Sequence, residues 1–238
     1  MNRICLILIL IVAGTVSICA QQQNHSGNNM HSGGLWVGAA TGPGWLVEKA
    51  PDSLMPEIQD YFNKLRSGWN SGFETGYFIN DYIGFGAKYS MFDTKQQVDS
   101  IVVEFFSNIF YINLSSDMKI HTLSPMVYGR LPLLNNKLSV SGGIGPAWLF
   151  YRNIGKAVND SAMFKGSSPG LSTVLHISYE VFPNFSLDLQ GSYIHAFLKE
   201  FTQDDGNTHQ VIKLEEKDYQ NISRIDLSFG IVYTFRRK

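Results

Sequence analysis

The sequence predicts an all-β fold: an eight-stranded antiparallel up-and-down transmembrane β-barrel with a short helix in its first external loop. Three observations support this prediction. Eight segments alternate apolar and polar residues, their connections alternate between short and long, and aromatic residues lie at both ends of the segments. Composition alone does not separate this fold from a soluble domain, because the hydrophobic content of 44% is ordinary.

The eight segments have the two-residue period of a β-strand with two different faces. In the last one, Ile225, Leu227 and Phe229 begin an apolar face, while Asp226 and Ser228 lie on a polar one. The lengths suit the roughly 9–11 residues that a tilted strand needs to cross a bilayer. Glycine and alanine blur the faces of the first strand, and the fourth is also weakly patterned, but the turns require both. The predicted strands are 35–46, 68–79, 83–92, 119–131, 138–150, 169–181, 185–193 and 224–235.

The connections fall into two kinds. Short turns are expected at 80–82, 132–137 and 182–184, and long, mostly polar loops at 47–67, 93–118, 152–168 and 199–223. An outer-membrane barrel has short turns on its periplasmic side and long loops outside. A soluble meander gives no reason for this sorting.

Aromatic residues are expected at two membrane interfaces, because amphipathic rings prefer the headgroup level. The opposite face of the strands is rich in glycine and serine, which suits the narrow interior of an eight-stranded barrel. The turn ends carry Tyr77, Tyr82, Phe85, Phe182, Phe185 and Phe235, and the loop ends carry Trp45, Trp69, Tyr89, Phe92, Trp148, Phe150 and Tyr193.

A soluble lipocalin-like barrel, with its apolar face inward, is the alternative fold. Gly34-Leu35-Trp36 is similar to the Gly-x-Trp start of that family. No helix is expected after the last strand, however, and a face of glycine and serine would make a poor exterior. The transmembrane barrel is therefore favoured.

The N-terminus has the features of a cleaved export signal. Arg3 precedes an apolar run, and Ala20 is the small residue before the expected cleavage point. Both cysteines, Cys5 and Cys19, lie inside this segment, so no disulfide framework is expected in the mature chain. Acylation of Cys19 is disfavoured because Ile18 is not small.

The predicted organisation follows from these limits. Loss of Arg3 with the signal leaves 18 of the 19 Lys and Arg residues against 20 acidic ones, so no basic field for nucleic acid is expected. The expected parts are a signal peptide at 1–20, a flexible leader at 21–34, the barrel at 35–235 and a basic tail at 236–238.

Three stretches carry a resemblance to a known family: Ser67-Gly68-Trp69 running into Gly76-Tyr77-Phe78-Ile79, then Ile83-Gly84-Phe85-Gly86-Ala87-Lys88-Tyr89-Ser90, and the closing strand from Leu227 to Phe235. They resemble the small outer-membrane β-barrel proteins of Gram-negative bacteria, the class that includes the OmpA and OmpX barrels. The resemblance implies contact with outer-membrane lipid and lipopolysaccharide. The closing strand, ending in Tyr233 and Phe235, is similar to the family's assembly signal and implies folding by the barrel assembly machinery. The trailing Arg236-Arg237-Lys238 departs from that pattern.

Charged residues on the polar faces are expected to form a network in the lumen. Glu74 and Lys88 are equally distant from the turn residue Asp81, so they should be direct cross-strand partners. Opposite charges at these positions predict an ion pair. We interpret the network as packing that plugs a narrow barrel, with a path for protons or ions as the alternative.

A second group of charges is expected near the predicted turn at 182–184. Glu180 and Asp188 are equidistant from Asn184, which predicts two adjacent carboxylates. Such a pair requires a shared proton or a cation, and Arg130 is the expected counter-ion. Asp226 on the last strand completes the predicted lumen charge network.

Two external loops contain apolar patterns. In 51–66, Leu54, Ile58, Tyr61, Phe62 and Leu65 have helical spacing, which predicts an amphipathic helix on the barrel rim. In 101–114, the apolar residues indicate either an extension of two strands above the membrane or an interaction surface for a protein or lipid. That surface would consist of Val102, Val103, Phe105, Phe106, Ile109, Phe110 and Tyr111.

Three loops contain Asp-Ser followed by an apolar residue, with the serines at Ser53, Ser100 and Ser161. These triplets look like a periplasmic O-glycosylation sequon used by one group of Gram-negative bacteria. All three lie outside the predicted strands, so they are candidate modification sites.

The predicted function is that of a non-enzymatic outer-membrane protein, either envelope-structural or acting on partners through its external loops. A narrow channel for small solutes and a lipid A-modifying barrel enzyme are the alternatives. His121, His176 and His195 are available for catalysis, but no spacing singles out a nucleophile and base. No cofactor and no metal are expected.

Overall fold

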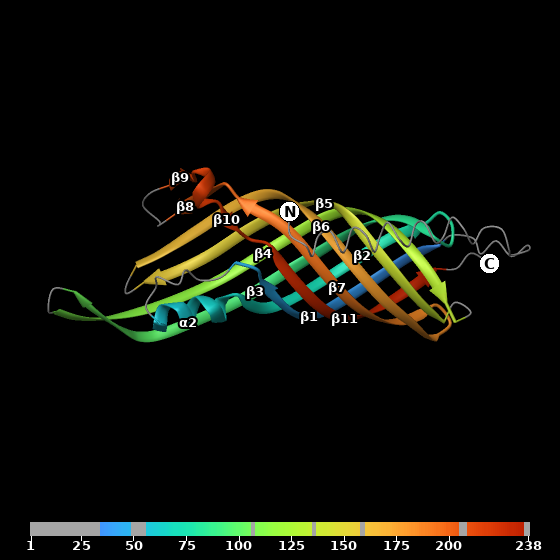
Figure 1. The fold of residues 1–238 in the computed structure, drawn as a ribbon, viewed down its shortest axis with the longest axis horizontal. Helices are drawn as coiled ribbons and strands as arrows, with labels where there is room; N and C mark the ends of the chain where they lie inside the picture. The colour runs from blue at the N-terminus through green and yellow to red at the C-terminus, as the bar shows by residue number, and fades with distance from the viewer. Residues whose placement is uncertain are drawn as a thin grey trace, which may run out of the picture.

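The computed structural model describes residues 34–48, 56–105, 108–134, 137–157, 160–204 and 209–235. Eight strands close into an antiparallel barrel, because β11 pairs with both β1 and β7 (Figure 1). The predicted fold class is confirmed. The barrel strands are β1 (Leu35–Leu46), β2 (Ser67–Phe78), β3 (Ile83–Phe105), β4 (Asn108–Leu133), β5 (Leu138–Ala157), β6 (Asp160–Phe182), β7 (Phe185–Leu198) and β11 (Arg224–Phe235).

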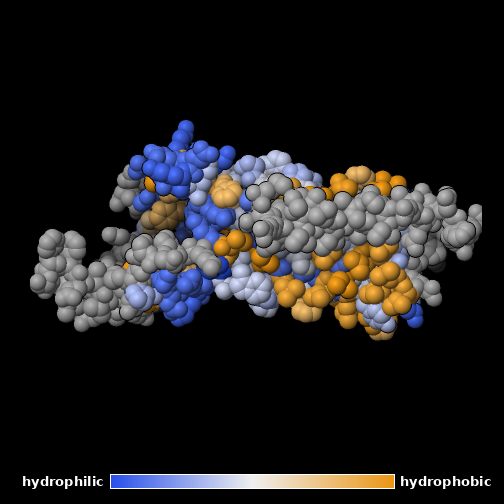
Figure 2. Space-filling model, in the orientation of Figure 1, coloured by the Kyte–Doolittle hydropathy of each residue, from blue (hydrophilic) through white to orange (hydrophobic). Residues whose placement is uncertain are grey.

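The apolar faces of the strands point outward. Trp69, Phe73, Phe85 and Leu123 are each at least half exposed, while polar side chains such as Asn70 are buried inside. The lipocalin-like alternative is therefore wrong, because it requires the reverse arrangement. Figure 2 shows hydrophobic residues gathered over the half of the barrel where β1 begins, and hydrophilic residues around the opposite end. This opposite end carries the long connections and is taken as external.

Four strands are much longer than the others and extend beyond them at the external end. β3, β4, β5 and β6 have 23, 26, 20 and 23 residues, whereas β1, β2 and β11 have 12 and β7 has 14. Much of the predicted loops 93–118 and 152–168 is therefore strand. The β3–β4 ladder runs to the pair Phe105↔Asn108, with a register shift between Val98 and Ile101. Of the two readings of 101–114, the backbone follows the strand extension.

The fourth predicted loop, 199–223, also contains structure. β8 (Glu200–Asp204) pairs with β6 and with β9 (His209–Lys213). A 3₁₀ turn, η1 (Glu216–Asp218), leads to β10 (Gln220–Asn221), which pairs with the end of β7. The external end is thus uneven: a tall wall of β3 to β6, β8 and β9 faces a low wall of β1, β2, β7 and β11 (Figure 1).

The helix predicted within 51–66 is present as α2 (Pro56–Leu65). Tyr61 and Leu65 are buried at 4% and 5% exposure, while Phe62 is 40% exposed. The helix therefore covers the external rim with one face, as its spacing predicts; Leu54 lies outside the described residues. Within the described part of the chain, helices are too short or too polar to cross a membrane.

Candidate functional site: lumen and external vestibule

The lumen is closed by two apolar layers with polar side chains between them. The outer layer lies below the external rim and includes the fully buried Phe92, Ile120, Leu149, Ile194 and Leu198. The inner layer lies nearer the turns and consists of Trp36, Phe78, Met126, Tyr128 and Val174. Two cavities beside the inner layer measure about 60 and 10 Å³. The smaller is about the size needed for a single water molecule.

Glu74 is the centre of the polar layer. Lys88 faces it directly across β2 and β3, with Nζ 3.0 Å from Oε1. The Tyr128 hydroxyl donates to Oε2 over 3.1 Å, and the Gln190 amide donates to Oε1. His176 Nε2 lies 3.3 Å from Oε2. The carboxylate thus has partners from β3, β4, β6 and β7: Tyr128 and Gln190 donate hydrogen bonds to it, while Lys88 Nζ and His176 Nε2 lie within ion-pair distance.

Asp188 is held by β6 rather than by a second carboxylate. Its Oδ2 lies 2.9 Å from His176 Nδ1, and its Oδ1 accepts from Ser178 over 2.6 Å. His176 therefore bridges Asp188 and Glu74. The sequence suggested His176 only as one of three histidines available for catalysis and did not place it in the network, because its partner Glu74 lies on a strand that does not pair with β6.

The predicted pairing of Glu180 with Asp188 is wrong. Glu180 lies opposite Ser186, and Asp188 opposite Ser178, with a register shift between Glu180 and Phe182. Asn184 adopts a positive φ of 71° in this turn, and the irregularity displaces the ladder from the symmetric hairpin that the prediction assumed. Instead, Glu180 Oε1 accepts from the Asn184 amide over 3.3 Å.

Arg130 is not the counter-ion of Asp188. Its guanidinium lies 4.1 Å from the centre of the Phe78 ring. Its Nε donates to the Asp81 carbonyl over 3.0 Å, and a terminal nitrogen lies 3.9 Å from the Asp81 carboxylate. Arg130 therefore connects β4 to the turn at 80–82, between β2 and β3.

A second buried ion pair lies nearer the outer layer. Arg224 is fully buried, and its Nε donates to Asp226 Oδ2 over 3.1 Å. Its other donors reach Ser90 Oγ at 2.6 Å and the Ile120 carbonyl at 3.3 Å. The predicted lumen charge network included Asp226 but left out Arg224. The available signal was their spacing, since residues two apart on a strand share a face.

The histidines form no hydrolytic triad in the described residues. His121 hydrogen-bonds the outward Tyr89 hydroxyl over 2.7 Å, and His195 Nδ1 lies 3.3 Å from Ser223 Oγ. Ser223 is 1% exposed, and its hydroxyl is engaged with the backbone N–H and carbonyl of Ala196. A nucleophile needs a free approach to substrate, which this hydroxyl lacks. The described side chains also include no group of three or more His, Cys, Asp or Glu residues placed to hold a metal.

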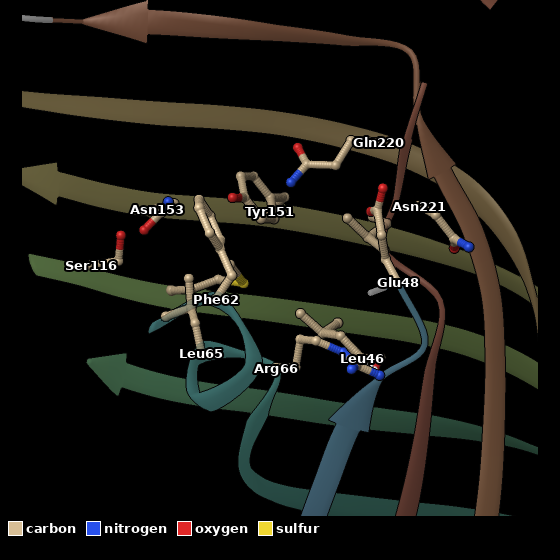
Figure 3. A pocket seen from close by; sticks show the side chains of 12 residues that line it. Leu46, Glu48, Phe62, Leu65, Arg66, Ser116, Tyr151, Asn153, Gln220 and Asn221 are labelled. Carbon is tan, nitrogen blue, oxygen red and sulfur yellow. Dashed lines mark hydrogen bonds between the residues drawn. The ribbon is translucent and has the colours of Figure 1, made fainter. Parts of the chain in front are cut away.

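A cavity of about 250 Å³ lies at the external end and is here called the vestibule (Figure 3). Leu46, Leu65, Met118 and Ile222 give it an apolar floor that continues the outer layer. The remaining lining is largely polar, and Phe62 of α2 projects into it in Figure 3. The other lining residues are Glu48, Arg66, Ser116, Tyr151, Asn153, Gln220 and Asn221.

Several polar groups that line the vestibule already have hydrogen-bond partners within the protein. Arg66 Nε and a terminal nitrogen both donate to the Leu46 carbonyl, at 3.1 and 3.0 Å. Burial raises the pKa of the Glu48 carboxyl, although the Asn221 backbone N–H opposes this shift. The Tyr151 hydroxyl is hydrogen-bonded by the side chains of Gln220 and Asn153. The Asn153 oxygen Oδ1, however, is buried without a hydrogen-bond partner.

The remaining predicted site residues are distributed along the external hairpins and the closing strand. The side chains of 99–112, which include Ser100 and the apolar set at 102–111, lie outside the described residues, as does Ser53. Ser100 and Ser161 lie in β3 and β6, so the expectation that all three serines lie outside strands is wrong; Ser161 is exposed. Tyr233 and Phe235 pack edge to face at 4.7 Å at the end of β11.

Comparisons with known proteins support this architecture. A major outer membrane protein from Thermus thermophilus matches with a TM-score of 0.55 and 15% identity, over 86% of this chain and 100% of that one. The outer membrane protein OprG from Pseudomonas aeruginosa matches with a TM-score of 0.49 and 14% identity, over 88% and 99%. At 15% identity, the likeness to the Thermus protein concerns the fold alone. No match to a curated protein was found.

The sequence profile of one family extends over almost the whole chain. Its description is "Outer membrane protein beta-barrel domain", and it matches residues 7–235. This range includes all eight barrel strands described above. The chain therefore belongs to the outer membrane protein beta-barrel domain family.

Proposed function

We propose that this barrel is a non-enzymatic protein of the bacterial outer membrane that acts through its external hairpins, in an envelope-structural or surface-interaction role. One observation carries the proposal. The apolar outer layer closes the lumen directly beneath a tall external wall, so the long strand extensions, α2 and the β8–β9 hairpin lie outside the membrane. Functional residues in barrels commonly lie on such connections, while the strands supply a rigid scaffold.

The layered lumen favours this role over a solute channel. Side chains such as Phe92, Ile120 and Leu149 leave no solvent-exposed surface, and the two ion pairs beneath them are buried among protein groups. Planar-bilayer recordings test this point. We expect no stable openings from the refolded protein, and reproducible conductance steps would favour the channel.

A complementation experiment tests the role of the hairpins. Excision of residues 97–115 would join Gln96 to Ser116, which are paired in the β3–β4 ladder, through a two-residue Asn-Gly turn. Excision of 154–163 would shorten β5–β6 in the same way, at the pair Asn153↔Phe164. We expect both chains to fold, and at least one to fail to restore the envelope or surface phenotype of a deletion strain. Full restoration by both would contradict the proposal.

We further propose export by a signal at residues 1–20, assembly by the barrel assembly machinery and contact with lipopolysaccharide. The features of the first twenty residues and the aromatic end of β11 support these steps. Intact mass spectrometry of protein from its native host should give a chain that begins at Gln21. The same spectrum tests O-glycosylation, since an unmodified mass would exclude it at Ser53, Ser100 and Ser161.

A further inference from the structure

We propose that the vestibule is a binding site for a small uncharged amphiphile, with an apolar body on the floor and a hydroxyl group that donates to Asn153 Oδ1. Two independent observations carry this inference. The first is a cavity with an apolar floor and a polar upper lining, which is the usual make-up of a small-molecule site. The second is a buried acceptor in that lining without a protein donor.

The size of the vestibule limits the ligand. Its volume of about 250 Å³ is slightly below the roughly 300–1,000 Å³ of sites for drug-sized ligands. The floor is formed by Leu46, Leu65, Met118 and Ile222, each at most 8% exposed. Since these residues belong to the close-packed outer layer, a ligand cannot extend deeper into the barrel. The body of the ligand is therefore short, comparable to a medium-chain alcohol.

The charged residues of the lining give the vestibule no preference for an anion or a cation. Glu48 and Arg66 contribute one acidic and one basic group, and Arg66 is already bonded to the Leu46 carbonyl. The unsatisfied atom is a neutral amide oxygen, which accepts a hydrogen bond. An uncharged donor such as a hydroxyl satisfies it, whereas an alkane leaves it buried and unpaired at a cost.

The position of the vestibule makes it accessible above the membrane interface. It lies where the low wall ends, between the end of β1, helix α2 and β10 (Figure 3). Trp45 on β1 and Trp69 on β2, exposed at 41% and 55%, mark the membrane interface on the outer surface of the barrel near this end. The inference goes beyond the proposed surface role and does not depend on it.

Photolabelling tests the site directly. Full-length protein in phosphatidylcholine nanodiscs would be irradiated with a diazirine derivative of octanol, and labelled peptides mapped by mass spectrometry. We expect label on the segments of the vestibule floor, and competition by n-alkanols that strengthens about fourfold per methylene until the cavity is full. Label confined to the lipid-facing belt would overturn the proposal.

Matched variants make the test specific. Asn153→Leu should weaken competition by n-octanol about fivefold, which corresponds to one neutral hydrogen bond, and leave n-octane unchanged. Asn63→Leu, on an exposed position of α2, is its control. Unchanged competition in Asn153→Leu would overturn the role of Oδ1.

Cavity-filling variants complete the design. Ile222→Trp should abolish labelling of the floor, and Ser116→Leu provides the same test if Ile222→Trp does not fold. Leu123→Trp, on the lipid-facing surface, should leave it intact. Undiminished labelling of the floor in a folded filling variant would contradict the site.

Discussion

Glu74 Oε1 lies 3.0 Å from Lys88 Nζ, and the two side chains are only 8% and 4% exposed. They occupy facing positions on β2 and β3, so the ion pair is set by the hairpin register. Burial of both groups makes each dependent on the other, because an unpaired charge in a dry interior is far costlier than one at the surface.

Removal of one partner of this pair should therefore be strongly destabilising. We expect Lys88→Met to lower the free energy of unfolding by about 3–5 kcal/mol, measured as the urea dependence of the folded band on unboiled gels. The matched control is Lys119→Met, which removes a pair at 3.4 Å with both side chains 39% exposed. Its effect should stay within about 1 kcal/mol. If Glu74→Gln combined with Lys88→Met recovers none of the loss, the explanation by unpaired charge fails.

Gly145 in β5 is required by the close approach of β4. A Cβ added there would overlap the carbonyl oxygen of Pro125. We expect Gly145→Ala to destabilise the barrel by about 1–3 kcal/mol, as overpacking does. Gly191→Ala is the control, because its Cβ would have nothing within 4 Å. Equal urea midpoints for the two variants would show that β4 moves aside.

The last aromatic residue of β11 should matter for assembly in cells rather than for stability. We expect Phe235→Ala to reduce the amount of folded protein in outer-membrane fractions, while refolding in detergent is largely retained. Phe229→Ala on the same strand is the control, since Phe229 is also outward-facing, at 66% exposure. Immunoblots of heated and unheated membranes measure both. Equal loss in the two variants would argue against a terminal signal.

Glu48 should give the vestibule a small dependence on pH. Because partial burial raises the pKa of this carboxyl above its ordinary value of 4.5, the folded state binds the proton more readily than the unfolded chain. Its contribution to stability is therefore lost as the pH rises through the folded pKa. Glu48→Gln should raise the thermal midpoint slightly near neutral pH and leave it unchanged below the ordinary value. Glu200→Gln on β8 is the control, and a gain that persists in acid would contradict the explanation.

The barrel strands were predictable because lipid imposes a strict alternation on them. β1 and β11 match their predicted bounds, and the outward positions Trp69, Phe73 and Phe85 carry the expected apolar side chains. The sequence offered an extension of two strands as one interpretation of 101–114, but the alternation did not predict how far β3 to β6 extend. Water can contact both faces of a strand above the membrane, so segments such as 95–98 in β3 need no alternation.

The interior was predictable only between adjacent strands. Glu74 and Lys88 follow from counting residues from one turn, but the bridge of His176 to Glu74 joins strands that do not pair. The same counting gave the wrong partner for Glu180, because the turn that follows it is irregular. Phe92 and Tyr193, both expected at the interface, are only 0% and 9% exposed, and the His195 ring lies beside Tyr193.

The buried network also makes the stability of the barrel depend on correct closure. Arg224 on the last strand bonds Ser90 on β3, and Asn70 on β2 bonds Ser228, 158 residues later. These partners meet only when β11 has joined β1. An open or misregistered sheet would leave Arg224 without Ser90, and Glu74 without Gln190 and His176. The interior therefore favours correct pairing of β11 with β1. The buried charges that destabilise an open barrel are the same ones that stabilise the closed barrel.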